Sequence, residues 1–417
     1  MFIRVRTMKY FLRLNSYIKP KPVLSFLVLV IAATTAGQVD PYLAGRAYMI
    51  QESYDSARVC LEEALETTPG DAEVLFNLGL TQFALRNFPE AREAFYQTEI
   101  RKKGMGSFYL AKTEIKLSHP EQAFKYLRIH LDSRYKKEEA EILLDEDITT
   151  LEGMPEWQQL WNDKKWYSAG DETFHEAMFL KNNGQQLEAI NLLNQLEKQG
   201  YERSRVQYEK AAIYKELGNE KAARSALKDA TRSDVRNLDA LQELARDQIE
   251  QGEYREAISS LDRVIRQDPA RFDAYRLRAD ARSGADDLQG ALDDLDLYLT
   301  YFPDNDKAIY QKGLIQHAHG KYLDAIQAFN RALELNGGES DYYFARGVTY
   351  SSTGTTRYAE KDFSMALDLD PLNGEIWFEK AKVSDRLGKR EVACHCYQKA
   401  FQYGIFEAGE FVDKLCN

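Results

Sequence analysis

The feature that most constrains the fold of this chain is an alanine that recurs every 34 residues. Seven alanines follow one another at that interval: Ala189, Ala223, Ala257, Ala291, Ala325, Ala359 and Ala393. Ala57 and Ala91 have the same spacing upstream, and Ala123 follows Ala91 after 32 residues. A fixed period of this length predicts a chain built from stacked copies of one small structural unit, each of which needs its neighbours to bury its apolar face.

Two further positions keep the same register. A glycine or alanine lies twelve residues before each of these alanines: Gly45, Gly79, Ala111, Ala177, Ala211, Ala245, Ala279, Gly313, Gly347 and Ala381. A large apolar residue lies four residues after each: Leu61, Phe95, Leu127, Leu193, Leu227, Leu261, Leu295, Phe329, Phe363 and Tyr397. Apolar residues at helical spacing, with turn signals such as Gly252-Glu253 between them, predict two helices of about a dozen residues per unit. The small residues then allow close helix approach, and the large residue fills the space between units.

This pattern resembles the tetratricopeptide repeat, whose unit has small residues at its eighth and twentieth positions and a large apolar residue at its twenty-fourth. The stretch from Gly320 to Phe329 matches the repeat closely. The resemblance covers about residues 38–130 and 170–403. It implies an all-α fold, an α-solenoid of antiparallel helix pairs (a TPR superhelix), with two arrays separated by a degenerate unit.

The register divides the chain into five segments. Residues 38–130 hold a first array of three units, residues 171–403 a second array of seven, and residues 404–417 a C-terminal cap. Residues 131–170 form a degenerate segment with an acidic pair, a leucine and then Pro155, and it holds Trp157, Trp161 and Trp166. We interpret it as a cap on the first array; the alternative is a partner-binding hinge between the arrays.

Residues 1–37 read as a leader. Basic residues without any acid precede an apolar run from Val23 to Ala33, and small residues follow up to Gly37. That order is typical of a secretory signal peptide, here with cleavage after Ala36. The alternatives are an uncleaved N-terminal membrane anchor and a fortuitous apolar leader. We therefore expect an exported, periplasmic protein, or else one anchored to the membrane by this segment.

The charges and the chemistry-bearing residues exclude several classes of function. A net charge of −11 argues against nucleic-acid binding. Cys394-His395-Cys396 lacks a second ligand pair at zinc-site spacing, so we expect no metal. The sequence contains no phosphate-binding glycine-rich loop, nucleophile elbow or zinc-protease motif, so we expect no cofactor and no catalytic residue. With only four cysteines, the helices are expected to hold by packing alone. Paired carboxylates, Asp286-Asp287 and Asp293-Asp294, are interpreted as solvated faces and helix starts.

The family resemblance also implies where a partner would bind. The first helix of each unit lines the concave face, and its fifth, ninth and twelfth positions point into the groove. The fifth position is aromatic in eight units: Tyr42, Phe76, Phe108, Phe174, Tyr208, Tyr310, Phe344 and Phe378. Such a row suits a peptide or an amphipathic helix, although ordinary repeat packing is the alternative. Charged residues, among them Arg246, Glu250, Arg276 and Asp280, interrupt the row in the second array.

These observations predict a non-catalytic scaffold of a bacterial cell envelope that binds one or more protein or peptide partners on its concave face. One alternative is a structural or assembly subunit of a larger envelope or secretion complex, with Trp157, Trp161 and Trp166 as a possible interface. The third hypothesis is an accessory to an enzyme. The known chaperone-tail clamp of the family, a lysine at the fifth position and an asparagine at the ninth, is absent from the aligned units.

Overall fold

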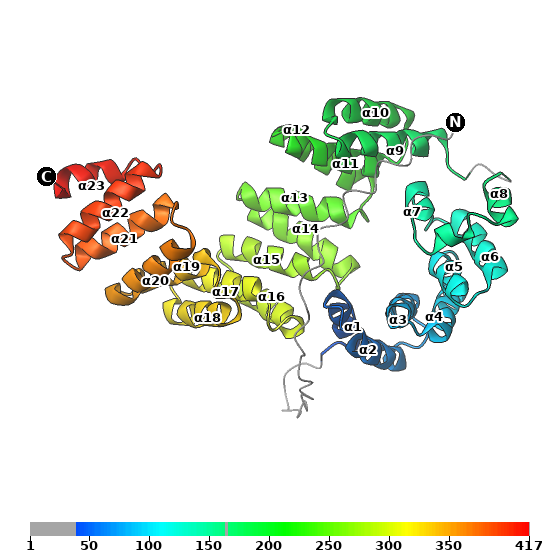
Figure 1. Ribbon diagram of the computed structural model, residues 1–417, viewed down its shortest axis with the longest axis horizontal. Coiled ribbons are helices and arrows are strands. Elements are labelled where there is room, and N and C mark those ends of the chain that lie inside the picture. Colours follow the sequence, from blue (N-terminus) through cyan, green and yellow to red (C-terminus); the bar gives the residue numbers. More distant parts are fainter. Residues whose placement is uncertain (1–38, 163–165, 417) are drawn as a thin grey trace. The chain divides into compact units, whose positions relative to one another are not determined.

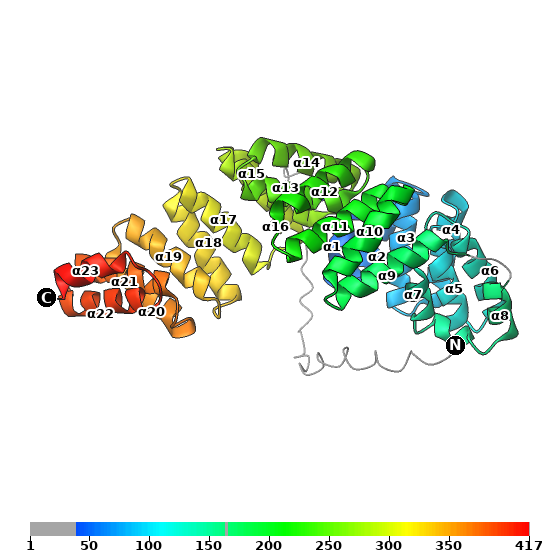
Figure 2. The same ribbon diagram turned by 90° about the horizontal axis from the view of Figure 1, so that it is seen from above.

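The computed structural model describes residues 39–162 and 166–416, and these residues form helices and no β-strand. The helices follow one another as antiparallel pairs joined by short turns (Figures 1 and 2). The prediction of an all-α fold of tetratricopeptide-type helix pairs is confirmed. The leader predicted over residues 1–37 lies outside the described residues. Within the described part of the chain, no helix is long and apolar enough to cross a bilayer.

Three helix pairs come first, followed by a segment of shorter helices. The pairs are α1 (Pro41–Ile50) with α2 (Tyr54–Thr67), α3 (Ala72–Ala84) with α4 (Phe88–Arg101), and α5 (Ser107–Lys116) with α6 (Pro120–Leu131). The segment after them contains α7 (Glu139–Leu143), the 3₁₀ helix η1 (Ile148–Leu151) and α8 (Pro155–Asn162).

Seven further pairs and one terminal helix complete the described chain. The pairs are α9 (Ala169–Asn182) with α10 (Gln186–Gln199), α11 (Arg203–Glu216) with α12 (Glu220–Ser233), α13 (Leu238–Glu250) with α14 (Tyr254–Gln267), α15 (Phe272–Gly284) with α16 (Leu288–Tyr301), α17 (Asp306–Ala318) with α18 (Tyr322–Leu335), α19 (Ser340–Ser352) with α20 (Thr356–Leu369), and α21 (Gly374–Arg386) with α22 (Arg390–Gln402). The last helix is α23 (Ala408–Leu415).

Local sequence signals explain where the helices begin and end. The side chains of Asp71, Asn237 and Asn305 accept hydrogen bonds from the first-turn N–H groups of α3, α13 and α17, as N-caps do. The turns inside the units need a left-handed residue, which is glycine in most of them; Gly252 and Gly320 have φ values of 74° and 72°. The turn at Gly252 is the one named from the sequence.

The contact that defines each unit joins its eighth and twenty-fourth positions. A Cβ atom added at Gly79 would lie 2.5 Å from Cε1 of Phe95, and one added at Gly347 would lie 2.8 Å from Cε1 of Phe363. The large side chain therefore lies directly on the glycine of its own unit, and Phe95 also stacks on Tyr109 of the next unit at 5.4 Å. The alanines of the 34-residue ladder are buried in all ten units.

One of the acidic residues expected in solvent is instead part of a buried ion pair. Asp287 caps α16 as expected, since its Oδ1 accepts the N–H of Gly290. Asp294, however, is buried and accepts two hydrogen bonds from Arg278, at 2.9 and 2.6 Å. Arg346 repeats this bidentate contact with Asp362 at 2.7 Å. The prediction of a solvated face was wrong for Asp294, because its place on α16 turns it toward α15.

The expectation that packing alone holds the helices was also wrong at the C-terminal end. Cys394 of α22 forms a disulfide with Cys416, the residue after α23, and the bridge ties this terminal helix to the last pair. Cys60 and Cys396 are free. The sequence spacing drew attention to the neighbouring Cys394 and Cys396. The packing of α23 against α22 instead determines which thiol lies close enough to Cys394 to form the disulfide.

His130, in the last turn of α6, is a buried imidazole. Its Nε2 accepts the N–H of Lys137 at 3.0 Å, and its ring lies 5.1 Å from that of Phe108. Burial, helped by the charge of Lys137, lowers the pKa of His130 to about 4. As the pH falls, His130 is therefore protonated at a higher pH in the unfolded chain than in the folded chain.

Overfilling the contact between the eighth and twenty-fourth positions should destabilise the array. We expect Gly347→Trp, and Ala291→Trp at the twentieth position, each to lower the free energy of unfolding by about 2 kcal/mol or more, because the close helix crossing has no room for an indole. Thermal unfolding followed by circular dichroism measures the change. Lys361→Trp, at an exposed position of α20, is the control and should leave the melting temperature unchanged. Unchanged melting of both test variants would contradict the register.

The buried imidazole should make stability fall in weak acid. The free energy of unfolding begins to fall as the pH drops through about 6.5, and the fall is complete near pH 4. At pH 5 the free energy of unfolding is about 2 kcal/mol lower than at pH 7. His130→Gln removes this proton site, and other titrating groups are common to both proteins. Urea unfolding at pH 7 and pH 5 should therefore show a smaller pH effect in the variant. Equal losses in the two proteins would overturn this account of His130.

Candidate functional site

The predicted aromatic row lies on the first helices of the units, but its side chains are largely used in packing. Phe108, Phe174 and Phe378 are buried, and the other five are half-buried: Tyr42, Phe76, Tyr208, Tyr310 and Phe344. In four units the aromatic ring contacts the ring at the twenty-fourth position of the same unit; the pairs are Phe76–Phe95, Tyr310–Phe329, Phe344–Phe363 and Phe378–Tyr397, all with centroids 5.7 or 5.8 Å apart. Their part in partner binding stays a prediction, and the three buried rings contribute to the core.

Two tyrosines of the predicted aromatic row already contact other side chains of the same chain through the hydroxyl group or the ring. The hydroxyl of Tyr42 accepts a hydrogen bond from Nη1 of Arg46 at 3.0 Å. The ring of Tyr310 stacks on that of Tyr342 at 4.6 Å, and burial raises the pKa of Tyr310 to about 12. The pKa of Tyr42 is raised as well, chiefly by burial, so both tyrosines remain neutral at physiological pH.

An apolar surface accompanies the aromatic row on two neighbouring first helices. Leu314 lies one turn after Tyr310 on α17 and is 41% exposed, and Val348 lies one turn after Phe344 on α19 and is half-buried. Residues four apart share one face of a helix, and α17 contacts α19. Tyr310, Leu314, Phe344 and Val348 are called the apolar strip below. Leu314 and Val348 occupy the ninth position of their units, which the family resemblance also places in the groove, but the predicted row contained only the aromatic residues of the fifth position.

Next to the apolar strip, the first helices carry a polar network. Nε of Arg276 on α15 donates to Oε1 of Gln311 on α17 at 3.0 Å. The amide nitrogen of Gln311 donates in turn to the carbonyl oxygen of Arg276 at 2.8 Å and to Oδ1 of Asp280 at 2.7 Å. Burial raises the pKa of Asp280, while Gln311 and two arginines oppose that shift. Arg276 and Asp280, two of the charged residues expected to interrupt the aromatic row, are thus joined through Gln311. Arg246 instead pairs with Glu243 on its own helix.

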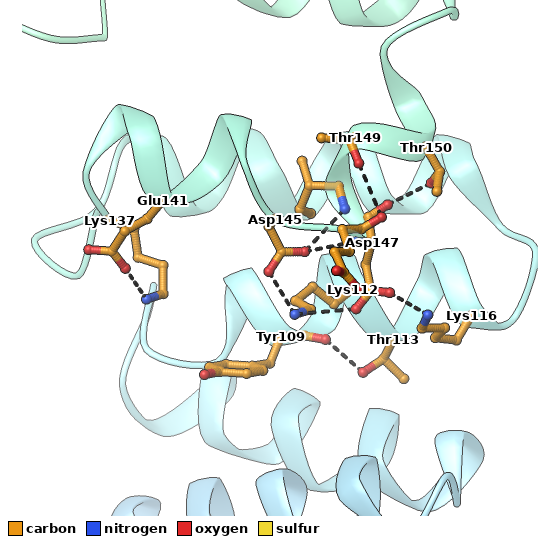
Figure 3. A network of polar contacts seen from close by, with 12 residues as sticks. Tyr109, Lys112, Thr113, Lys116, Lys137, Glu141, Asp145, Asp147, Thr149 and Thr150 are labelled. Atoms are coloured by element: carbon orange, nitrogen blue, oxygen red, sulfur yellow. Dashed lines mark hydrogen bonds and ion pairs between the residues drawn. The ribbon is translucent and has the colours of Figure 1, made fainter. Parts of the chain in front are cut away.

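The segment after the third unit is fastened to that unit by ion pairs (Figure 3). Nζ of Lys112 on α5 lies 2.7 Å from Oδ2 of Asp145 and 3.2 Å from Oδ2 of Asp147, and Lys116 pairs with Asp147 as well. The other oxygen of Asp145 accepts the N–H groups of Asp147 and Ile148, which starts η1. The acidic pair noted in the sequence therefore anchors the segment to the third unit.

The three tryptophans lie in and directly after the same segment. Trp157 is buried, and its ring meets that of Trp161 edge-on at 5.6 Å. Trp161 and Trp166 are half-buried, and Nε1 of Trp166 donates to the carbonyl oxygen of Leu160 at 2.7 Å. Together they belong to a core cluster that also contains Phe108, Phe124 and Leu127 of the third unit. This packing favours the interpretation of a cap and leaves Trp157 little surface for a partner.

The histidines and cysteines do not gather into a site with the chemistry of a metal or a nucleophile. Cys394 is bridged to Cys416, and Cys396 is buried. His317 and His319 turn to different partners, Thr349 at 2.9 Å and Ser283 at 3.2 Å. Over residues 39–162 and 166–416, no three histidine, cysteine or acidic side chains are arranged to hold a metal ion.

Comparison with known protein sequences identifies the same repeat in several parts of the chain. Sequence profiles of the tetratricopeptide repeat match residues 42–105, 204–234, 243–308 and 280–340. A UDP-N-acetylglucosamine–peptide N-acetylglucosaminyltransferase of Giardia intestinalis is 39% identical over 87 residues, which are 21% of this chain and 6% of the transferase. Superkiller complex protein 3 of Homo sapiens is 28% identical over 155 residues, which are 35% of this chain and 10% of that protein. The similarity to these much longer relatives is therefore partial.

A solved structure shares the fold over more than half of the chain. The crystal structure of a tetratricopeptide repeat protein from Parabacteroides merdae superposes with a TM-score of 0.51 at 17% identity, and the match covers 60% of this chain and 99% of that protein. At this identity the likeness concerns the fold alone. The repeated register, the helix pairs and the profile matches agree with one another, and the chain belongs to the tetratricopeptide-repeat family.

Proposed function

We propose that this chain is a non-catalytic scaffold that binds a protein or peptide partner on the face formed by its first helices. The observation that carries the proposal is the apolar strip, where four aliphatic and aromatic side chains from α17 and α19 remain partly open to solvent. Partly exposed apolar side chains on adjacent helices are what an amphipathic helix or extended peptide needs for docking. The polar network around Gln311 borders the strip, so the partner combines an apolar segment with polar groups beside it.

Two observations support a place in the cell envelope, with the chain exported to the periplasm or held there by its N-terminal segment. The leader has the basic, apolar and small order of an export signal. The Cys394–Cys416 disulfide fits an oxidising compartment, since such bridges are rare where thiols are kept reduced.

A second candidate function is that of a permanent subunit in a larger envelope or secretion complex. It is favoured by apolar side chains at the loops near the C-terminal end, where Phe406 is 79% and Leu372 is 67% exposed. Phe401 is also exposed and lies 6.1 Å from Phe406. Residues of this kind are costly to leave in water and are typical of a surface that another subunit covers.

The role of the apolar strip can be tested by charge substitution. We expect Leu314→Glu combined with Val348→Glu to abolish recovery of the partner in affinity purification from an envelope extract of the source organism, because docking would bury two carboxylates. Leu323→Glu is the matched control: Leu323 is 72% exposed on α18 of the same unit as Leu314. The control should recover the same proteins as the unmodified chain. The proposal fails if the strip variant, folded as judged by circular dichroism, recovers them equally.

Export to an oxidising compartment predicts the state of the cysteines in cells. When cells are quenched in acid and alkylated, Cys394 and Cys416 should react only after reduction, whereas Cys60 should react without it. Peptide mass analysis reads both states, and the mass of the mature N-terminus shows in the same sample whether cleavage follows Ala36. Alkylation of Cys394 and Cys416 without a reductant would argue against export.

A further inference from the structure

A recess separate from the apolar strip lies between the second helices of the second and third units. It is an open groove of about 680 Å³ between α4 and α6, above the end of α5. Its lining includes Arg92, Glu93, Tyr96, Glu114, His119 and Tyr126. Volumes of a few hundred Å³ are typical of sites that receive a ligand or an anchoring side chain.

The groove contains a carboxylate that is largely withdrawn from water. Glu114, in the last turn of α5, is 4% exposed, and its Oε2 lies 2.9 Å from Nδ1 of His119. Burying a carboxylate is costly unless it is paired or hydrogen-bonded. The His119 side chain is itself half exposed, and both Glu114 and His119 line the groove.

The charges around the groove are predominantly negative. Glu93 and Glu121 add two exposed carboxylates to that of Glu114, against the single guanidinium of Arg92. The pKa of Tyr126 reflects this environment: burial raises it first, and Glu114 raises it further, while Arg92 lowers it. An anion would meet net repulsion here, and a cation would be attracted.

Two tyrosines contribute aromatic rings to the lining of the groove. Tyr96 on α4 is 46% exposed, and Tyr126 on α6 is half-buried. Tyrosine rings attract a cation over their faces, and a planar guanidinium both stacks on such a ring and donates two hydrogen bonds to one carboxylate. A divalent metal is a poorer fit, since no group of three metal-ligating side chains occurs in the described segments of the chain.

We propose that this groove receives an arginine side chain of a protein partner, with its guanidinium on the Glu114 carboxylate and its flat face on Tyr96 or Tyr126. The inference rests on the proposed function as a partner-binding scaffold, but it concerns a surface separate from the apolar strip. It assigns a basic residue to one segment of the partner.

A single-arginine probe tests the site. We expect acetyl-Gly-Arg-Gly-amide to bind the full chain in saturation-transfer NMR at 150 mM NaCl, and the same peptide with citrulline, which has the shape of arginine without its charge, to bind much more weakly. Glu114→Gln should weaken binding about tenfold or more, because a charge-assisted pair is lost. Tyr96→Ala should weaken it about threefold. The Tyr96 side chain is exposed enough that its loss leaves the fold intact.

The control separates the groove from the general acidity of the chain. Glu391→Gln removes one exposed carboxylate from α22, so it changes the net charge as Glu114→Gln does and should leave binding unchanged. Equal binding of the arginine and citrulline peptides overturns the proposal. So does undiminished binding by both groove variants. The strip variants used for the proposed function leave this groove intact, so failure of one proposal is distinguishable from failure of the other.

Discussion

The structure depends on the contact between the small residue at the eighth position of a unit and the large side chain at the twenty-fourth, seen in all four units that have glycine at the eighth position. Gly79 against Phe95 and Gly347 against Phe363 show how close it is, since an added Cβ would overlap the ring. This contact sets the distance between the two helices of a unit. The same ring also reaches the next unit, as Phe95 does on Tyr109. Stability is therefore a sum over neighbouring units, and any surface along the array is held by local packing.

This arrangement divides the apolar residues into those that hold the array and those that remain available. In four units the aromatic ring at the fifth position contacts the ring at the twenty-fourth position, so these four rings help to hold the array. Two of them, Tyr310 and Phe344, also remain partly open to solvent. Leu314 and Val348 are one turn further along and remain partly open. The groove near Glu114 arises differently, because it lies between second helices of adjacent units. The two surfaces suit different features of a partner, an apolar segment and a basic side chain.

The fold could be predicted from the sequence because its period and its small residues are local features of the repeat. What could not be predicted depends on the rotation of helices and on contacts between distant residues. Asp294 looks like any surface acid until α16 turns it toward Arg278. Cys416 is 22 residues from Cys394, and only the course of α23 brings the thiols together. The apolar strip could have been found from the ninth position, whereas Glu114, Tyr96 and Tyr126 have no common spacing that would mark a groove.

The central claim, that the contact between the eighth and twenty-fourth positions sets the helix spacing, is tested most directly by a double-mutant cycle on Gly79 and Phe95. In an exposed helix, replacing glycine by alanine stabilises by about 1 kcal/mol. Here we predict that Gly79→Ala lowers the free energy of unfolding while Phe95 is present, and raises it in the Phe95→Ala background, where the ring is gone. A coupling of about 1 kcal/mol or more between the two changes would support the account. Strict additivity, with Gly79→Ala stabilising both backgrounds equally, would contradict it.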